Sequence, residues 1–297
     1  MNKSMIYIIT LALLLHPLGT TFVYAQGEGP KIKWRADTLM RTMPETKEKS
    51  GGAEITVTES LTSVHAEIFP DSPVTLLWGS NFKNVFISGN ATTIDLPAML
   101  VAREMPFGAE FDLPFLGQEG YRLGVRAVPS YYTDSWEDSF NDFETGAFRW
   151  ISEYWAVLPG NERFSLKGGI RFKPEHDIRV VPVIDLLYQF NDRWAFRITS
   201  EDGGLVYTLN EKTKLFSEYR YVVDEYEVSQ NGQSGRVLLH RQNNAGLGVE
   251  HQFAKNWSVT TTAGVAFNRK FAFETEPLTK TQLKESVYLT LGVKGQF

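Results

Sequence analysis

The chain has 297 residues, of which 42% are hydrophobic and 13% aromatic, with a formal net charge of −5 and no cysteine. The apolar content excludes a mostly disordered chain, and the lack of cysteine excludes disulfides, thiolate zinc sites, cysteine nucleophiles and a lipoprotein anchor. The acidic balance argues against nucleic acid as a partner, because phosphate binding requires a basic surface. The aromatic share favours β-structure.

Residues 1–25 have the features of a secretory signal peptide. Lys3 supplies a positive start, Met5–Leu15 is an apolar run, and Val23-Tyr24-Ala25 forms a cleavage-type site. The apolar run is shorter than the roughly 20 residues that a membrane-spanning helix needs, so a membrane anchor is the disfavoured alternative. We therefore expect export through the signal peptide and a mature chain that starts at Gln26.

The next segment, residues 26–52, is polar, mixed in charge and without periodicity. It predicts a flexible periplasmic leader or a segment that enters a lumen. From about Ala53 the side chains alternate with a period of two residues, which is the mark of β-strands with two different faces. The expected organisation is a signal peptide (1–25), a leader (26–52) and a β-domain (53–297).

The alternation is clearest in residues 164–173, where Phe164, Leu166, Ile170 and Phe172 alternate with Ser, Lys and Arg. A soluble β-sandwich would alternate as well. The polar faces here mix charge with Gly and Ser, as in the interior of a membrane β-barrel. The same pattern recurs in residues 121–128, 245–253 and 257–267.

The connections between these strands alternate between a short and a mostly longer set. We expect the short set at the periplasmic end and the long, acidic set outside. The sequence thus predicts an all-β, transmembrane, antiparallel up-and-down β-barrel of about 12 strands, with a range of 10–14. Residues 90–120 contain three prolines and could hold a further strand. The predicted strands are 53–69, 74–89, 121–132, 146–158, 163–173, 180–190, 193–200, 204–210, 213–228, 236–253, 256–272 and 284–297.

The last predicted strand carries apolar residues on one face up to the final residue. This face resembles the C-terminal assembly signal of bacterial outer-membrane proteins, which the barrel-insertion machinery reads. Gly295 departs from that signal, since a large residue usually stands there. We expect the bacterial outer membrane of a Gram-negative envelope as the location, with its lipid and the insertion machinery as partners. The signal residues are Leu289, Leu291, Val293 and Phe297.

Three further segments carry a family resemblance. Residues 182–199 (PVIDLLYQFNDRWAFRIT) precede Leu205–Leu209, and Tyr131–Asp138 (YYTDSWED) follows an apolar strand. The chain is similar to uncharacterised outer-membrane β-barrel proteins known only by a domain-of-unknown-function label, over roughly residues 53–275. The resemblance implies a barrel and an outer-membrane address, and it supplies no catalytic residues.

Charged residues on the polar strand faces predict a charged lumen. They comprise nine cations and five anions, an excess that favours small anionic solutes. In the alternative, the charges pair across a narrow interior and plug it. The candidate lumen residues are Arg122, Arg126, Arg149, Glu153, Lys167, Arg171, Asp185, Arg197, Lys214, Glu218, Arg220, Asp224, Glu250 and Lys294.

The sequence carries no strong catalytic or metal motif. The histidines lack metal-ligand spacing, so no cofactor is expected. The loop Asp134–Glu144 is rich in carboxylates, and a solvated loop is favoured over a cation site at Asp134, Asp138 and Asp142. We expect a passive, porin-like pore that is not an enzyme. The alternatives are a closed structural barrel that acts through its outer loops and, less favoured, a lipid hydrolase using His240 or His251.

Overall fold

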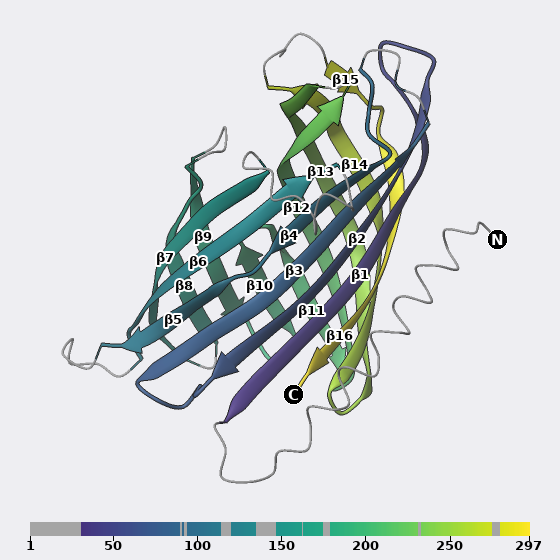
Figure 1. Cartoon of the computed structure of the whole chain (residues 1–297). Coiled ribbons are helices and arrows are strands. Elements are labelled where there is room, and N and C mark those ends of the chain that lie inside the picture. Colours follow the sequence, from purple (N-terminus) through teal and green to yellow (C-terminus); the bar gives the residue numbers. More distant parts are fainter. Residues whose placement is uncertain are drawn as a thin grey trace. The chain divides into compact units, whose positions relative to one another are not determined.

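The computed structural model describes residues 31–89, 91, 94–113, 120–134, 147–161, 163–174, 179–230, 233–274 and 280–297. The chain divides into two units, 1–31 and 32–297, and all described strands belong to the second unit (Figure 1). The predicted signal peptide lies outside the described residues. In the described part of the chain, no helix is long and apolar enough to cross a membrane.

Sixteen strands within these residues form a single sheet. They are β1 (Ile32–Lys47), β2 (Glu54–Ile68), β3 (Val74–Ser88), β4 (Met99–Glu104), β5 (Phe107–Asp112), β6 (Arg122–Thr133), β7 (Phe148–Asn161), β8 (Phe164–Phe172), β9 (Val180–Gln189), β10 (Trp194–Thr199), β11 (Asp202–Asn210), β12 (Thr213–Gln230), β13 (Gln233–Ala254), β14 (Trp257–Phe273), β15 (Lys280–Gln282) and β16 (Ser286–Gln296).

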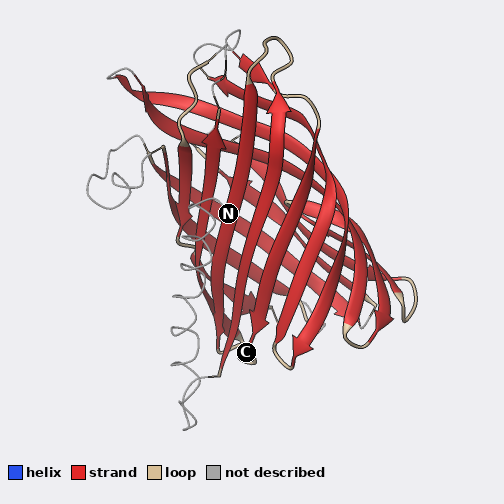
Figure 2. Ribbon diagram, turned by 90° about the vertical axis from the view of Figure 1, so that its right-hand side faces the viewer, coloured by secondary structure: helices blue, strands red, loops and turns tan. Residues whose placement is uncertain are grey.

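The sheet closes on itself as an antiparallel barrel (Figure 2). Strand β1 pairs with β2 on one side and with β16 on the other, and β14 joins β16 to β13. Strands β4 and β5 lie end to end between β3 and β6, and β15 and β16 lie end to end beside β14. The barrel therefore has 14 strand positions, within the predicted range but above the expected 12.

The two additional positions lie in segments that the sequence analysis did not assign to strands. The predicted leader is wrong for residues 32–47, which form β1, while residues 26–30 lie outside the described part. The outward side chains of β1 include Ala36, Thr38 and Thr42, so its apolar alternation is weak. In the other segment, Pro106 interrupts the strand between β4 and β5, because proline cannot donate a ladder hydrogen bond.

The start of the first strand, β1, and the end of the last strand, β16, lie at the same rim of the barrel, which we call the turn end. There Trp34 and Phe297 exchange two backbone hydrogen bonds of 2.8 and 2.9 Å. The turn end carries the connections that were predicted to be short. The opposite rim, which we call the far end, carries the connections that were predicted to be mostly longer. The difference in length is smaller than expected, because β12 and β13 extend until only residues 231 and 232 separate them.

The strands differ in length, and this changes the barrel toward the far end. Strands β8, β9, β10 and β11 contain 9, 10, 6 and 9 residues, whereas β12 and β13 contain 18 and 22. Strand β12 pairs with β11 only as far as Arg220, and its Glu227 then pairs with Thr133 of β6. Beyond the tips of β7–β11, a narrower ring therefore continues without those strands.

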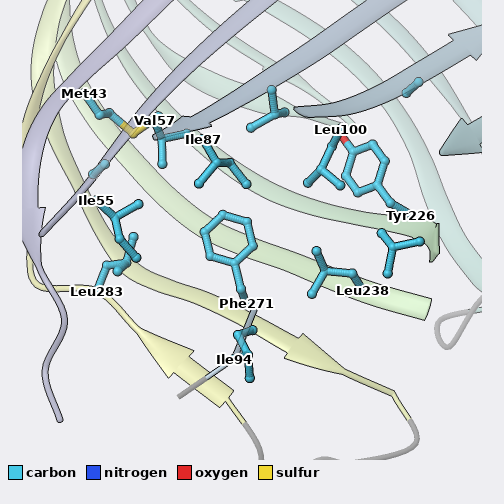
Figure 3. Packing of buried hydrophobic residues seen from close by; sticks show 14 of the residues in the cluster. Met43, Ile55, Val57, Ile87, Ile94, Leu100, Tyr226, Leu238, Phe271 and Leu283 are labelled. Atoms are coloured by element: carbon cyan, nitrogen blue, oxygen red, sulfur yellow. The ribbon is translucent and has the colours of Figure 1, made fainter. Parts of the chain in front are cut away.

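Inward side chains fill this narrower ring with a packed apolar cluster, which we call the apolar cap (Figure 3). Met43, Ile55 and Val57 enter it from β1 and β2 and are fully buried. Tyr226 packs edge-on against Tyr132, with ring centroids 6.0 Å apart. The cap consists of Met43, Ile55, Val57, Val85, Ile87, Ile94, Leu100, Ala102, Tyr132, Tyr226, Val228, Leu238, Ala266, Phe271, Phe273, Leu283 and Tyr288.

The rest of the barrel, between the turn end and the narrower ring, is the wide ring. Around it the apolar side chains point outward instead. Leu247 is 72% exposed, and Val287, Leu289 and Leu291 of β16 are 64%, 57% and 56% exposed. In a β-sandwich such rows would be pressed between two sheets, so this arrangement excludes that alternative. The proposed assembly-signal residues Leu289, Leu291, Val293 and Phe297 all belong to these exposed apolar side chains.

The first prediction concerns Gly124, which faces Trp155 across β6 and β7. A Cβ atom at Gly124 would lie 2.0 Å from the indole ring, which is itself held by a 2.8 Å hydrogen bond to Glu110. We expect Gly124→Ala to lower the free energy of unfolding by about 1–3 kcal/mol through overpacking. The measurement is the temperature at which the folded band disappears from an unboiled gel.

The matched control is Gly168→Ala on β8, where an added Cβ would have no atom within 4 Å. It should leave the unfolding temperature nearly unchanged. Equal unfolding temperatures for the two variants would show that Trp155 does not pack over Gly124 as described.

Candidate functional site

The wide ring encloses a cavity of about 1950 Å³, which is the candidate functional site. At the turn end it is lined by Trp34, Trp194, Asn256 and Phe297. In the other direction it reaches Arg41, Glu59 and other polar groups directly beneath the apolar cap. The cavity therefore extends from the turn end through the wide ring and stops at the cap.

The cavity lining is charged but balanced. It includes 13 Lys and Arg residues and 14 Asp and Glu residues. The prediction of a net basic lumen is therefore wrong for the described lining. Two of the predicted cations do not line the cavity, and the lining adds nine unpredicted carboxylates against six unpredicted cations. The added carboxylates include Glu59, Glu104 and Glu110 of β2, β4 and β5.

Most of the predicted lumen residues line this cavity, and two do not. Arg122 lies near the turn end, where its Nε atom donates a 2.7 Å hydrogen bond to Asp112. Arg149 is buried and lies 3.4 Å from Glu225 of β12. The residues that do line it are Arg126, Glu153, Lys167, Arg171, Asp185, Arg197, Lys214, Glu218, Arg220, Asp224, Glu250 and Lys294.

One cluster of charges holds β6, β7 and β8 together on the cavity wall. Glu153 of β7 is only 1% exposed and accepts hydrogen bonds from Arg126 of β6 and, at 2.5 Å, from Arg171 of β8. Beside it, the Lys167 ammonium lies 3.8 Å from the centre of the Trp155 ring. Because one carboxylate accepts hydrogen bonds from two guanidinium groups, Glu153 links the side chains of three neighbouring strands.

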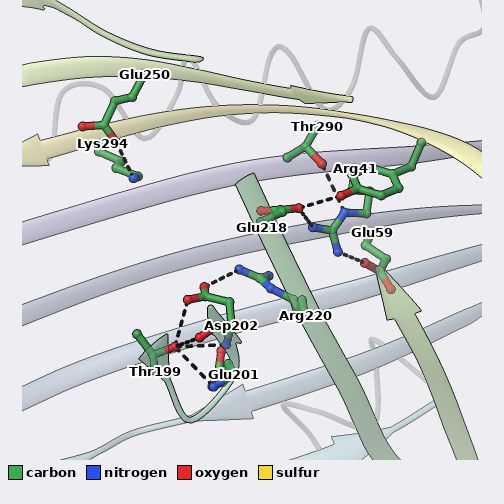
Figure 4. A network of polar contacts seen from close by, with 11 residues as sticks. Arg41, Glu59, Thr199, Glu201, Asp202, Glu218, Arg220, Glu250, Thr290 and Lys294 are labelled. Carbon is green, nitrogen blue, oxygen red and sulfur yellow. Dashed lines mark hydrogen bonds and ion pairs between the residues drawn. The ribbon is translucent and has the colours of Figure 1, made fainter. Parts of the chain in front are cut away.

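A second cluster forms the inner limit of the cavity under the apolar cap (Figure 4). Arg41 of β1 is 2% exposed and lies 3.4 Å from Glu59 of β2 and 3.2 Å from Glu218 of β12. It also donates a 3.1 Å hydrogen bond to Thr290 of β16. These contacts join strands across the interior in this layer, as the plugged alternative expects.

One further ion pair and a buried histidine continue this polar layer around the ring. Lys83 of β3 lies 2.5 Å from Asp224 of β12. His240 of β13 is buried behind Asp224 and stacks on Phe271, with ring centroids 4.7 Å apart. The layer thus meets the apolar cap directly. Closer to the turn end, Lys294 pairs with Glu250 at 2.7 Å and leaves the cavity open.

The two candidate hydrolase histidines lie in different places. His240 is buried within the barrel, whereas His251 is exposed on the outer face and its Nδ1 atom lies 3.0 Å from the Thr213 hydroxyl. The two residues are thus not brought into one site.

The described residues contain no group of three His, Cys, Asp or Glu side chains able to hold a metal ion. Of the candidate cation ligands, Asp134 accepts a 2.9 Å hydrogen bond from the Ser229 backbone N–H. Asp138 and Asp142 lie outside the described residues.

Sequence reasoning missed Arg41, Glu59 and Lys83 of the polar layer, and also Glu104, which accepts a 2.6 Å hydrogen bond from the Tyr132 hydroxyl on the cavity wall. A signal was present for two of these residues. Glu59 and Lys83 lie within predicted strands, and each sits at a position that alternates with outward side chains. Arg41 lies in β1, which pairs with β16 over eight residue positions, a partnership that the sequence pattern does not reveal.

Comparisons with known proteins give no biochemical role for this chain. Residues 161–294 match a family model described as a domain of unknown function, DUF6268. The predicted likeness to a family known only by such a label is confirmed for that segment. A comparison with curated proteins gave no match.

Three similar solved structures, two of which are named as channels, share a likeness with this chain that concerns the fold alone. The COG4313 outer membrane channel from Pseudomonas putida F1 is 13% identical, with a TM-score of 0.46 over 92% of this chain and 97% of that chain. A TodX monoaromatic hydrocarbon channel mutant is 9% identical, with a TM-score of 0.42 over 90% of each chain. Salmonella typhi OmpF is 10% identical, with a TM-score of 0.40 over 91% of this chain and 98% of that chain.

The second prediction concerns Glu153. The variant Glu153→Gln leaves Arg126 and Arg171 facing each other without a compensating charge. Since both guanidinium side chains are about one quarter exposed, we expect a loss of about 2–3 kcal/mol, below the usual cost of breaking a fully buried pair. Urea denaturation in detergent, followed by tryptophan fluorescence, measures this loss.

The matched control is Glu54→Gln, because Glu54 lies 3.6 Å from Lys47 in a pair whose side chains are 45% and 61% exposed. It should change stability by less than about 1 kcal/mol. If Glu153→Gln were as mild as this control, the cluster would not hold the three strands together.

Proposed function

We propose that the chain is an outer-membrane β-barrel that acts as a channel for small polar solutes. The observation that carries the proposal is the charged cavity of about 1950 Å³ inside the wide ring. Residues 1–25 would direct export, and the apolar outer face of β16 would serve the barrel-insertion machinery.

The outer face of the wide ring supports a membrane address. Exposed aliphatic side chains such as Leu247, Val265 and Leu289 face outward over polar inward positions. Strands β8, β9 and β11 contain 9, 10 and 9 residues, close to the about 9–11 residues that cross a bilayer when tilted. The exposed aromatic residues Phe190 and Trp194 at the turn end match the interfacial belt of such barrels.

The balanced lining supports a weakly selective channel. Charged pore walls select ions by the field that they produce, and here cations and anions of the wall are nearly equal in number. Ion pairs such as Lys294 with Glu250 and Arg220 with Asp202 reduce that field further. We therefore do not retain the expected preference for anions.

A second candidate function is a closed barrel that binds partners at its far end. The apolar cap favours it, because packed side chains of β1, β2, β3, β13 and β14 fill the narrow ring. A lipid hydrolase is the least supported alternative, since His240 is stacked against Phe271 and buried.

The third prediction is ion conduction by the refolded protein in planar lipid bilayers. We expect discrete current steps with a cation-to-anion permeability ratio within about threefold of unity, because the wall charges nearly cancel. Heat-denatured protein in the same detergent is the control. Silent bilayers that contain barrel shown to be folded by its heat-dependent gel mobility would favour the closed barrel instead.

The fourth prediction uses the pair of Lys294 and Glu250 on the cavity wall. Glu250→Lys places two cations side by side, so the permeability ratio should shift toward anions by about twofold or more. The reversal potential in a salt gradient measures this shift. The control is Glu45→Lys on β1, an exposed position outside the cavity lining, which should leave the reversal potential unchanged.

A further inference from the structure

The wall of the wide ring is incomplete on one side near the far end. Strand β12 pairs with β11 as far as Arg220 and meets β6 only at Glu227. Strand β9 pairs with β10 only from Asp185 toward the turn end. Among the described strands, none pairs with residues 221–226 on the β11 side or with residues 180–184 on the β10 side. A gap thus separates β9 from β12 beyond the tip of the β10–β11 hairpin.

The cavity extends into this gap. Five residues of β12, Tyr221–Glu225, which lack a strand partner on the β11 side, line the cavity. Three consecutive residues of β9, Val180–Pro182, and the hairpin tip Thr199–Asp202 do the same. We call these three segments the side mouth.

Exposed side chains flank the side mouth. Val180 and Tyr221 line the cavity and are 56% and 51% exposed. Both lie next to the gap in strand pairing, so the cavity adjoins exposed surface there. The buried ion pair of Arg149 and Glu225 connects β7 to β12 and marks the border of the mouth next to the narrow ring.

The straight path along the barrel axis is closed at the same level. Arg41, Glu59 and Glu218 form a layer across the interior, and the fully buried Met43, Val57 and Leu100 lie beyond it (Figures 3 and 4). A solute that entered at the turn end would meet this layer and then a packed apolar core. The side mouth lies on the cavity side of the polar layer and of the apolar core, so neither blocks it.

We infer that solutes pass between the cavity and the outside through the side mouth rather than along the barrel axis. This inference rests on the channel function proposed above. The tips of β8, β9 and β11 mark the outer limit of the membrane-spanning wall, because these strands, of 9, 10 and 9 residues, have only the length needed to cross it. The side mouth therefore opens where the outer surface of the membrane meets water, beneath the apolar cap.

The chemistry of the rim indicates amphipathic solutes. Its outer side presents Val180, Ile184 and Tyr221, whereas Asp202, Asp224 and Glu225 lie on its cavity side with their basic partners. A molecule with a short apolar chain and a polar head can contact both surfaces at once. Such molecules also concentrate at a membrane interface, which is where the mouth opens.

The test uses the absence of native cysteine, which allows one thiol to be placed at will. Val223→Cys in the side mouth is compared with Ser50→Cys, an exposed position in the β1–β2 connection at the far end. Each folded variant is reconstituted in planar bilayers, its current is recorded, and a maleimide-linked polyethylene glycol is then added. We expect the polymer to reduce the current by about twofold or more at Val223→Cys and to leave it unchanged at Ser50→Cys.

The recordings distinguish an error in the side mouth from an error in the channel function. If the polymer blocks at Ser50→Cys and has no effect at Val223→Cys, the route is axial, so the side mouth is rejected while the channel remains. If the folded, unlabelled variants and the parent chain carry no current, the channel function itself is rejected, and the side mouth is rejected with it.

A second arm tests the class of solute with sodium octanoate and sodium acetate as probes. Octanoate should reduce the ion current at a concentration about tenfold lower than acetate, because its alkyl chain binds the apolar rim. The double variant Val180→Ser, Tyr221→Ser should lose this difference, and the control Val287→Ser, Leu289→Ser on β16 should keep it. Equal block by both anions in the parent protein would reject amphipathic solutes.

Discussion

Backbone pairing between β1 and β16 is the interaction on which the structure depends. Eight residue pairs, from Arg35 with Gln296 to Thr42 with Leu289, join the first strand to the last and remove the two edges that an open sheet would have. Only a closed ring can face lipid, because every N–H and C=O group must find a partner within the wall. The outward apolar rows and the charged interior both presuppose this closure.

The sequence was sufficient to predict the sheet, its antiparallel order and the face of most strands. Alternation in residues 164–173 and 245–253 corresponds to β8 and β13, and the polar face there does line the cavity at Lys167, Arg171 and Glu250. Alternation is read within a segment, so it fails where the outward face is small and polar, as in β1. It also fails where proline divides a strand, as between β4 and β5.

The parts of the site that could not be predicted depend on contacts between distant strands. Arg41 and Glu218 are 177 residues apart in the sequence, yet they share one polar layer. The balance of charge in the cavity follows from such contacts, since Glu59 and Glu110 enter it from strands whose inward charges the pattern did not assign. Likewise, the barrel narrows at the far end because β12 extends beyond β11. This depends on where the β10–β11 and β12–β13 hairpins end, which the alternation within one strand does not indicate.

The composition of the apolar cap has a consequence for the order of assembly. Met43 enters it from β1, Tyr226 and Leu238 from β12 and β13, and Tyr288 from the final strand. Of the 17 cap residues, only Tyr288 lies in the final strand, so a chain emerging from its N-terminus would carry the other 16 in an unclosed sheet until its last dozen residues arrive. Completion of the core thus reports that the whole barrel has formed, and a truncated chain would keep both its interior and its seam open.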